Sequence, residues 1–275
     1  MAKPRGLLID IDGVLAMSWQ ALRGAPGALA RLRDAGVPFR LVTNTTSRTR
    51  AAIAQSLSAN RLPVGVDEIL SAPAATAAYL RTTYPGGRCL LLSSGSAIED
   101  LEGVATITMA PDGTIAGTAG RRATRAALAA VVIGGAGPEF TYEAVCALFQ
   151  LVLDGVPLVA MHRNRSWKTS DGIQLDSGAY LTAIEEATGV RATVLGKPDP
   201  AFFEAALRDL GMEAGEVAMV GDDINVDVLG AQALGMTGVL VRTGKFRPER
   251  LERSERKPDA VLDSFADVPT WLGLP

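Results

Sequence analysis

The chain has 275 residues, of which 48% are hydrophobic and 21% are charged, and its formal net charge is −3. This length allows one large domain or two smaller ones, and the small negative charge argues against nucleic acid or an anionic membrane as a partner. A single histidine excludes a histidine-rich zinc site, and Cys89 and Cys146 form no C-x-x-C pair. With no apolar run of about 18 residues and no secretory signal after Met1, we expect a cytoplasmic protein with reduced thiols.

The first predicted strand is a short apolar run over residues 7–9 that leads into Asp10, with Asp12 and Gly13 following. Such a run, ended by a glycine, predicts a buried strand that stops at Gly13. Because side chains alternate along an extended chain, we expect Asp10 and Asp12 to project to the same side. Two carboxylates in that position repel each other unless a cation lies between them, and Mg²⁺ prefers oxygen ligands. The alternative is a strand that simply ends in a polar loop.

Helices and strands then alternate through the first third of the chain. We expect helices over 26–36, around Ile53 and Leu57, and over 73–84, and strands over 37–42 and 66–70. The strand 37–42 is followed by the run Thr43-Asn44-Thr45-Thr46-Ser47. Hydroxyl and amide side chains in such a run are typical of a helix N-cap and of an anion-binding turn.

The middle of the chain has weaker signals. Strands are predicted over 89–92, 131–133 and 158–161, with helices over 121–130, from Thr141 to Val152, and over 178–188. Weak alternation over 104–118, around Pro111-Asp112-Gly113, predicts a hairpin. We expect the polar run 162–171 to be a loop in which His162 is structural. Trp167 and Lys168 in that run either anchor an exposed loop or contact a substrate.

The last third returns to regular alternation. Strands are predicted over 193–195, 217–220, 239–241 and 260–262, with helices over 200–210 and 226–234. The charged run 245–257 is expected to be a solvated surface segment. Alternating strands and helices over nearly the whole chain indicate an α/β fold with a mainly parallel sheet.

Four polar positions each lie at the end of, or directly after, a different predicted strand: Asp10, Thr43, Lys197 and Asp222. Ligands of parallel α/β sheets bind beyond the carboxyl ends of the strands, so we expect these side chains to converge. Carboxylates with Mg²⁺, a lysine and a hydroxyl-rich turn describe a phosphate site, where Thr43, Asn44 and backbone amides can donate hydrogen bonds. One carboxylate can attack phosphorus and another can transfer the proton.

The motifs DIDGVL, TNTT, GKPDP and GDDINVD occur in this order. They resemble the four signatures of the haloacid dehalogenase-like (HAD) hydrolases. Together with FTYEAVCALFQLVLDGVPLVAMH in the middle, they resemble subfamily IIA and, within it, the phospholysine/phosphohistidine inorganic pyrophosphate phosphatase-like branch. The resemblance implies a Rossmann-like parallel-sheet core, residues 1–81 and 185–275, with an inserted α/β cap domain of the C2 type, residues 82–184.

The resemblance also implies roles for the acidic residues. Asp10 matches the nucleophile and a metal ligand, and Asp12 matches the general acid/base, whose backbone carbonyl is also a metal ligand. Asp222 matches the direct Mg²⁺ ligand, and Asp223 and Asp227 match supporting acidic positions. For phosphate binding, Thr43 and Asn44 match the second motif, and Lys197 matches the lysine that holds phosphate and offsets the charge of the nucleophile.

The resulting hypothesis is a Mg²⁺-dependent phosphatase that acts on a small phosphorylated metabolite through an aspartyl-phosphate. A phosphotransferase or mutase with the same chemistry is the enzymatic alternative, and a non-catalytic protein that binds a phosphate ligand is the other. The segment 104–130 contains more residues than related caps use there. It is either a solvated excursion or a contact surface, which would serve a homodimer formed through the cap or present cations to an anionic substrate.

Overall fold

The computed structural model describes residues 3–115, 128–169 and 172–274, leaving aside the side chains of 167–169. The chain forms two compact units. The core unit comprises Met1–Thr43, Arg50–Leu70 and Lys197–Pro275, and the cap unit comprises Asn44–Thr49 and Ser71–Gly196. The boundaries proposed from the sequence, at 81/82 and 184/185, fall within helices α3 (Ala72–Thr83) and α5 (Ser177–Thr188). The proposed division into domains stays a prediction.

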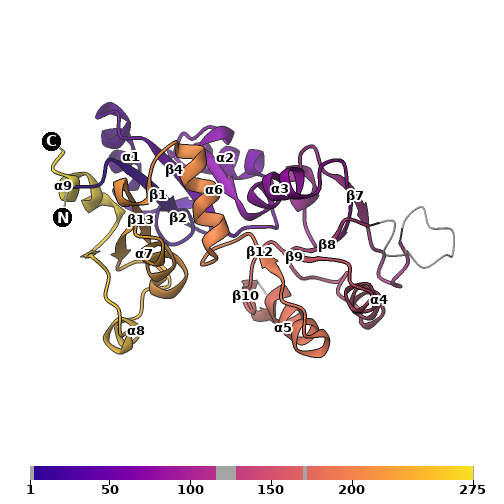
Figure 1. Cartoon of the computed structure of the whole chain (residues 1–275). Coiled ribbons are helices and arrows are strands. Elements are labelled where there is room, and N and C mark those ends of the chain that lie inside the picture. Colours follow the sequence, from indigo (N-terminus) through magenta and orange to yellow (C-terminus); the bar gives the residue numbers. More distant parts are fainter. Residues whose placement is uncertain (1–2, 116–127, 170–171, 275) are drawn as a thin grey trace. The chain divides into compact units, whose positions relative to one another are not determined.

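The core unit is built on a six-stranded sheet with the order β15-β14-β13-β1-β4-β5. Figure 1 labels its strands β13, β1 and β4. The pairs β15–β14, β14–β13, β13–β1 and β1–β4 are all parallel, which confirms the predicted Rossmann-like α/β architecture. The strands are β1 (Gly6–Asp10), β4 (Phe39–Thr43), β5 (Ile69–Ser71), β13 (Val217–Gly221), β14 (Thr237–Val241) and β15 (Ala260–Leu262), and a small antiparallel pair joins β2 (Ala16–Met17) to β3 (Gln20–Ala21).

The described helices of the core unit connect these strands. They are α1 (Ala25–Asp34), α2 (Arg50–Ala59), α6 (Pro200–Leu210), α7 (Leu229–Ala233), α8 (Pro248–Arg253) and α9 (Val268–Leu272), with shorter turns η1 (Val66–Glu68), η4 (Ala214–Glu216), η5 (Ile224–Val228) and η6 (Phe265–Asp267). The predicted helix over 226–234 is divided into the π-helical turn η5 and the short helix α7. The charged run 245–257, expected to be a solvated segment, includes α8.

Strand β1 lies in the middle of the sheet because both of its faces are apolar. All five of its residues are buried, and Leu7 and Ile9 pack in the main core with Leu41 of β4 and Val220 of β13. A strand covered on both sides reads as a continuous apolar run, which is the pattern seen in residues 7–9. Asp10 is the last residue of β1, so it lies at the carboxyl end of a central, buried strand.

The cap unit contains a second sheet, with the order β12-β9-β8-β6-β7 and parallel pairing throughout. Its strands are β6 (Arg88–Leu92), β7 (Ala105–Thr108), β8 (Ala130–Ile133), β9 (Leu158–Ala160) and β12 (Thr193–Val194), and its helices are α3, α4 (Tyr142–Leu153), α5 and the turn η2 (Ala97–Asp100). Leu148 and Val152, four residues apart on one face of α4, are buried in the core of this unit. Among the described residues of the chain, no helix has the length and apolarity needed to cross a bilayer.

The segment 104–118 differs from the expected hairpin. Residues 105–108 form the edge strand β7 of the cap sheet, parallel to β6 in the register Arg88↔Ala105. The turn around Pro111-Asp112-Gly113 is present, with Met109 bridged to Ile115 in antiparallel fashion. Local alternation could not show that β7 pairs with a strand earlier in the chain. The predicted helix 121–130 lies largely outside the described residues, so the role of the whole segment stays a prediction.

The polar run 162–171, expected to be a loop, includes one arm of a two-stranded hairpin. Strand β10 (Ser166–Thr169) pairs with β11 (Gly172–Leu175) in antiparallel register. Ile173 and Leu175 are exposed on β11, so no apolar face marked these strands as buried. The backbone of Trp167 and Lys168 lies in β10, and their role in substrate contact stays a prediction.

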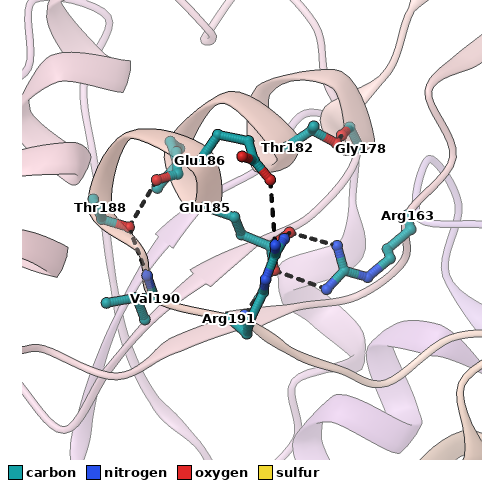
Figure 2. A network of polar contacts seen from close by, with 10 residues as sticks. Arg163, Gly178, Thr182, Glu185, Glu186, Thr188, Val190 and Arg191 are labelled. Carbon is teal, nitrogen blue, oxygen red and sulfur yellow. Dashed lines mark hydrogen bonds and ion pairs between the residues drawn. The ribbon is translucent and has the colours of Figure 1, made fainter.

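A buried carboxylate secures the carboxyl end of α5 within the cap unit (Figure 2). Glu185 accepts a bidentate pair of hydrogen bonds from Arg163, at 2.7 and 2.8 Å, and another from the backbone N–H of Ala192 at 2.8 Å. The Arg163 hydrogen bonds lower the pKa of Glu185, and the Ala192 N–H adds to this against the opposing effect of burial. Glu186, the next residue, is 68% exposed and contacts Arg191 at 3.3 Å.

We expect Glu185→Gln to destabilise α5 by about 1–3 kcal/mol at pH 7, because the hydrogen bonds from Arg163 lose their buried, charged acceptor. The lowered pKa means that this stabilisation is present above pH 4.5, the ordinary pKa of the group, and is lost as the pH falls further. Hydrogen–deuterium exchange of the α5 amides measures the effect. Glu186→Gln is the matched control and should change the free energy of amide opening in α5 by less than about 0.5 kcal/mol. Equal losses in the two variants would contradict the stabilising role of Glu185.

Candidate active site

Three neighbouring strands bring polar residues to one edge of the core sheet. Asp10 is the last residue of β1, Thr43 is the last residue of β4, and Asp222 directly follows β13. The parallel registers Asp10↔Val42 and Ile9↔Val220 place these strand ends beside one another. The strand ends that carry Asp10, Thr43 and Asp222 therefore meet at one edge of the sheet, as expected from the sequence.

Lys197 links two buried carboxylates at this edge. Its Nζ donates to Asp10 Oδ1 at 2.6 Å and to Asp227 Oδ1 at 2.7 Å. The three residues are 3%, 6% and 1% exposed for Lys197, Asp10 and Asp227. Burial alone would lower the pKa of Lys197, but the carboxylates of Asp10 and Asp227 raise it above its ordinary value. The lysine is therefore a permanent cation that offsets part of the negative charge.

The carboxylates of Asp10, Asp222 and Asp227 form a cluster that fits a divalent cation. Oxygen atoms from all three lie within 4.8 Å of one another, and all three residues are buried. In the described part of the chain, Asp222 Oδ1 is a buried oxygen without a hydrogen-bond partner. Coordination of a cation would satisfy such an oxygen. When fully ionised, the three carboxylates and Lys197 carry two uncompensated negative charges. A hard cation with oxygen ligands, such as Mg²⁺, matches both the charge and the donor atoms.

Burial and mutual repulsion disfavour ionisation of this cluster. Burial raises the pKa of Asp10 from 3.8 to about 6, with Lys197 acting in the opposite direction. Burial also raises the pKa of Asp222 from 3.8 to about 7, and the charges of Asp10 and Asp227 add to this effect. A buried acidic group with a strongly raised pKa and a specific charged partner is characteristic of a functional site.

These pKa values predict how the metal-free protein responds to pH. Because the folded state holds protons on Asp10 and Asp222 that the unfolded chain releases near pH 4, their contribution to stability falls as the pH rises from about 4 to about 7. We therefore expect Asp222→Asn to match wild type near pH 4 and to exceed it in unfolding free energy at pH 8, in EDTA. The backbone N–H of Lys245 donates to Asp222 Oδ2 at 2.7 Å, and the asparagine retains an acceptor oxygen for it.

Urea unfolding at several pH values measures this difference. Added Mg²⁺ should stabilise wild type at pH 8 and leave Asp222→Asn nearly unchanged. Glu204→Gln, an exposed acidic position on α6, is the control and should follow wild type throughout. A constant difference between Asp222→Asn and wild type across the pH range would contradict the raised pKa.

Asp12 lies two residues beyond the end of strand β1. It is exposed, whereas Asp10 is buried, and its carboxylate is not part of the cluster found among the described residues. Strand β1 ends at Asp10, and the chain turns at once, since the N–H groups of Leu15 and Ala16 both donate to the Ile11 carbonyl at 3.0 Å. The alternation of an extended strand therefore does not reach Asp12. Its acid/base role and its carbonyl's role as a metal ligand stay predictions.

The short stretch directly after Thr43, Asn44–Thr49, belongs to the cap unit. Residues 44–49 contact loops of that unit, where Ser96 Oγ donates to the Ser47 carbonyl at 3.4 Å. Thr43 itself is buried in the core unit. Asn44 lies on the cap-unit side of the division, so its part in phosphate binding stays a prediction.

Proteins similar in sequence match nearly the whole length of the chain. Residues 7–106 match the family described as haloacid dehalogenase-like hydrolase, and residues 194–268 match the HAD-hydrolase-like family. The human haloacid dehalogenase-like hydrolase domain-containing protein 2 is 37% identical over 261 residues, which are 95% of this chain and 93% of the relative. This chain belongs to the haloacid dehalogenase-like hydrolases. As predicted, it is of subfamily IIA.

Further comparisons agree with this HAD assignment. The human phospholysine phosphohistidine inorganic pyrophosphate phosphatase is 34% identical, covering 99% of this chain and 95% of that protein. Among solved structures, the p-nitrophenyl phosphatase from Archaeoglobus fulgidus has a TM-score of 0.86 and 28% identity, covering 98% of this chain and all of that one. The similarity therefore extends over both units of the HAD fold.

The sequence did not reveal two features of this HAD site. Asp227 was expected as a supporting acidic position, yet it lies in direct contact with Lys197. Lys245 was assigned to a solvated run, yet its backbone N–H donates to Asp222 Oδ2 at 2.7 Å. Burial alone would lower the pKa of the Lys245 side chain, but the charges of Asp10 and Asp222 raise it. The signal available was that Thr243-Gly244-Lys245 follows the end of strand β14.

Proposed function

We propose that this HAD hydrolase is a Mg²⁺-dependent phosphatase that hydrolyses a small phosphorylated metabolite through an aspartyl-phosphate. The observation that carries the proposal is the buried cluster of Asp10, Asp222 and Asp227 with Lys197 at the carboxyl edge of the sheet. The relatives named as a p-nitrophenyl phosphatase and as a pyrophosphate phosphatase support the class of substrate.

The proposed reaction has two steps. In the first, a carboxylate oxygen of Asp10 forms a bond to phosphorus while the bond from phosphorus to the leaving oxygen breaks, and Asp12 gives its proton to that oxygen. In the second, Asp12 takes a proton from water, whose oxygen bonds to phosphorus, and the bond between phosphorus and Asp10 breaks. Inorganic phosphate leaves, and both aspartates return to their starting states.

The surrounding residues make attack on an anion feasible. Lys197 holds Asp10 in place and reduces the repulsion between its carboxylate and the phosphoryl group. Asp227 orients Lys197 from the other side. Bound Mg²⁺, held by Asp10, the Asp12 carbonyl and Asp222, would supply positive charge to the phosphoryl oxygens.

Hydrolysis of p-nitrophenyl phosphate tests the activity directly. We expect turnover with Mg²⁺ and none after EDTA treatment, with activity restored by added Mg²⁺. A panel of sugar phosphates, nucleoside monophosphates, pyridoxal phosphate and pyrophosphate would then identify the metabolite. Full activity in EDTA would contradict the metal assignment, and no activity on any member would contradict the proposed function.

Partition of the phosphoryl group tests the covalent intermediate. If all substrates pass through one aspartyl-phosphate, the ratio of phosphate transferred to added glycerol over phosphate released to water is the same for every leaving group. A ratio that varies with the leaving group would contradict the common intermediate. Transfer that greatly exceeds hydrolysis would favour the phosphotransferase alternative.

The role of Asp12 leads to a further expected result. We expect Asp12→Asn to reduce kcat for an alkyl phosphate by about 10²–10⁴-fold, because an alkoxide needs a proton in order to leave. The reduction for p-nitrophenyl phosphate should be at least tenfold smaller, since p-nitrophenolate is a good leaving group. Equal losses on both substrates would indicate that Asp12 acts through position or metal binding.

A further inference from the structure

Two glycines from distant parts of the core unit enclose the carboxylate of Asp222. Gly13 follows β1, and Gly244 follows β14. A Cβ atom built at either glycine would lie 1.9 Å from Asp222 Oδ2. Both glycines also have positive φ angles, 92° at Gly13 and 55° at Gly244, which other residues rarely adopt. Only glycine therefore allows the backbone to approach Asp222 this closely from both sides.

Two hydrogen bonds join these pieces. The backbone N–H of Lys245 donates to Asp222 Oδ2 at 2.7 Å. The hydroxyl of Thr243 donates to the Gly13 carbonyl at 2.5 Å, across 230 positions of the chain. The turn Thr243-Gly244-Lys245 thus ties the loop after β1 to the acidic residue after β13. We call this turn the carboxylate clamp.

The clamp uses one oxygen of Asp222 and leaves the other without a partner. Oδ2 accepts from Lys245, whereas Oδ1 is buried and has no hydrogen-bond partner in the described structure. Because the two oxygens of a carboxylate are rigidly linked, holding Oδ2 also fixes the direction of Oδ1. The bond from Thr243 holds the Gly13 carbonyl, one peptide beyond the Asp12 carbonyl, and so restrains the turn that carries both.

We propose that the carboxylate clamp is a positioning element. It orients Asp222 Oδ1 and the backbone carbonyl of Asp12 as ligands for Mg²⁺. The proposal rests on the proposed function, because that function assigns the cluster to Mg²⁺. Thr243 acts through Gly13 and Asp222 and needs no contact with the ion. Residues that orient metal ligands typically contribute about 10–100-fold to metal affinity.

Isothermal titration calorimetry with MgCl₂ tests the proposal on the whole protein. Thr243→Val keeps the shape of the side chain and removes the donor, and we expect Mg²⁺ to bind it about tenfold more weakly. Thr243→Ser keeps the hydroxyl and should bind Mg²⁺ within about threefold of wild type. Wild-type affinity in Thr243→Val would overturn the proposal, as would an equal loss in both variants, which would indicate packing of the methyl group.

A second pair of variants decides the question if Thr243→Val does not fold. Gly244→Ala places a Cβ against Asp222 Oδ2, whereas Gly211→Ala has a similar positive φ, 67°, with no atom within 4 Å of the new Cβ. We expect weaker Mg²⁺ binding for Gly244→Ala and wild-type binding for Gly211→Ala. Equal affinities in the two variants would overturn the proposal.

The calorimetric readout separates this proposal from the proposed function. Wild-type protein that binds Mg²⁺ but hydrolyses no phosphate ester would contradict the function and leave the clamp supported if Thr243→Val binds more weakly. Wild-type protein that binds no Mg²⁺ would overturn the clamp itself. In active protein, the concentration of Mg²⁺ needed for half-maximal activity should rise with the calorimetric Kd of each variant.

Discussion

Asp10→Asn is expected to reduce phosphatase turnover by about 10³-fold or more, because an amide is a poor nucleophile and the proposed aspartyl-phosphate cannot form. The fold should remain intact. The substitution is nearly isosteric, and it removes one negative charge from a buried cluster in which Asp227 remains paired with Lys197. We therefore expect the unfolding free energy in EDTA to stay within about 1 kcal/mol of wild type, or to rise.

Steady-state kinetics with p-nitrophenyl phosphate and urea unfolding measure the two effects. Glu204→Gln, which changes an exposed carboxylate on α6, is the matched control and should keep full activity. A variant Asp10→Asn that retains a tenth of wild-type kcat would contradict the nucleophile assignment. Lost activity accompanied by a large loss of stability would place Asp10 among the structural residues instead.

Lys197→Met should have the largest effect on stability. The methionine fills similar space, but it leaves the buried carboxylates of Asp10 and Asp227 without their shared cation. Removing one partner from a buried ion pair costs about 3–5 kcal/mol, and we expect a loss of this order at pH 8 in EDTA. Phosphatase activity should disappear as well, since Lys197 offsets the charge of the proposed nucleophile.

The pH dependence identifies the cause of that loss. Lys197 lowers the pKa of Asp10. Without it, the Asp10 carboxylate of the folded state should take up a proton more readily, so the destabilisation should be smaller at pH 5 than at pH 8. Adding Asp227→Asn to Lys197→Met should recover part of the stability at pH 8. Lys257→Met, at an exposed lysine that donates to two backbone carbonyls, is the control. The same loss at pH 5 and pH 8 would indicate a packing defect.

Much of the fold was predictable because its signals are local. Apolar runs such as residues 7–9 mark strands buried on both faces, and Leu148 and Val152 share one helix face by their spacing alone. Alternating helices and strands predicted a parallel α/β sheet, and parallel sheets bring the ends of their strands to one edge. For that reason the convergence of Asp10, Thr43 and Asp222 was visible in the sequence.

Pairing between distant segments was not predictable in the same way. Residues 105–108 alternate only weakly, and their place as the edge strand β7 depends on hydrogen bonds to β6. Strand β11 carries exposed apolar residues such as Ile173, so no buried face marked the β10–β11 pair. In each case the stabilising partner lies in another segment, and a local pattern does not contain it.

The sequence by itself determined the chemical class of the core site: acidic residues and a lysine at the ends of parallel strands. Only the tertiary structure decided which groups touch. It left Asp12 exposed while it buried Asp10, and it brought Asp227 to Lys197 and Gly244 to Asp222. Motif spacing indicates which residue types lie near one edge. Burial and side-chain direction arise from packing between distant segments, such as those of Gly13 and Thr243, which are 230 positions apart.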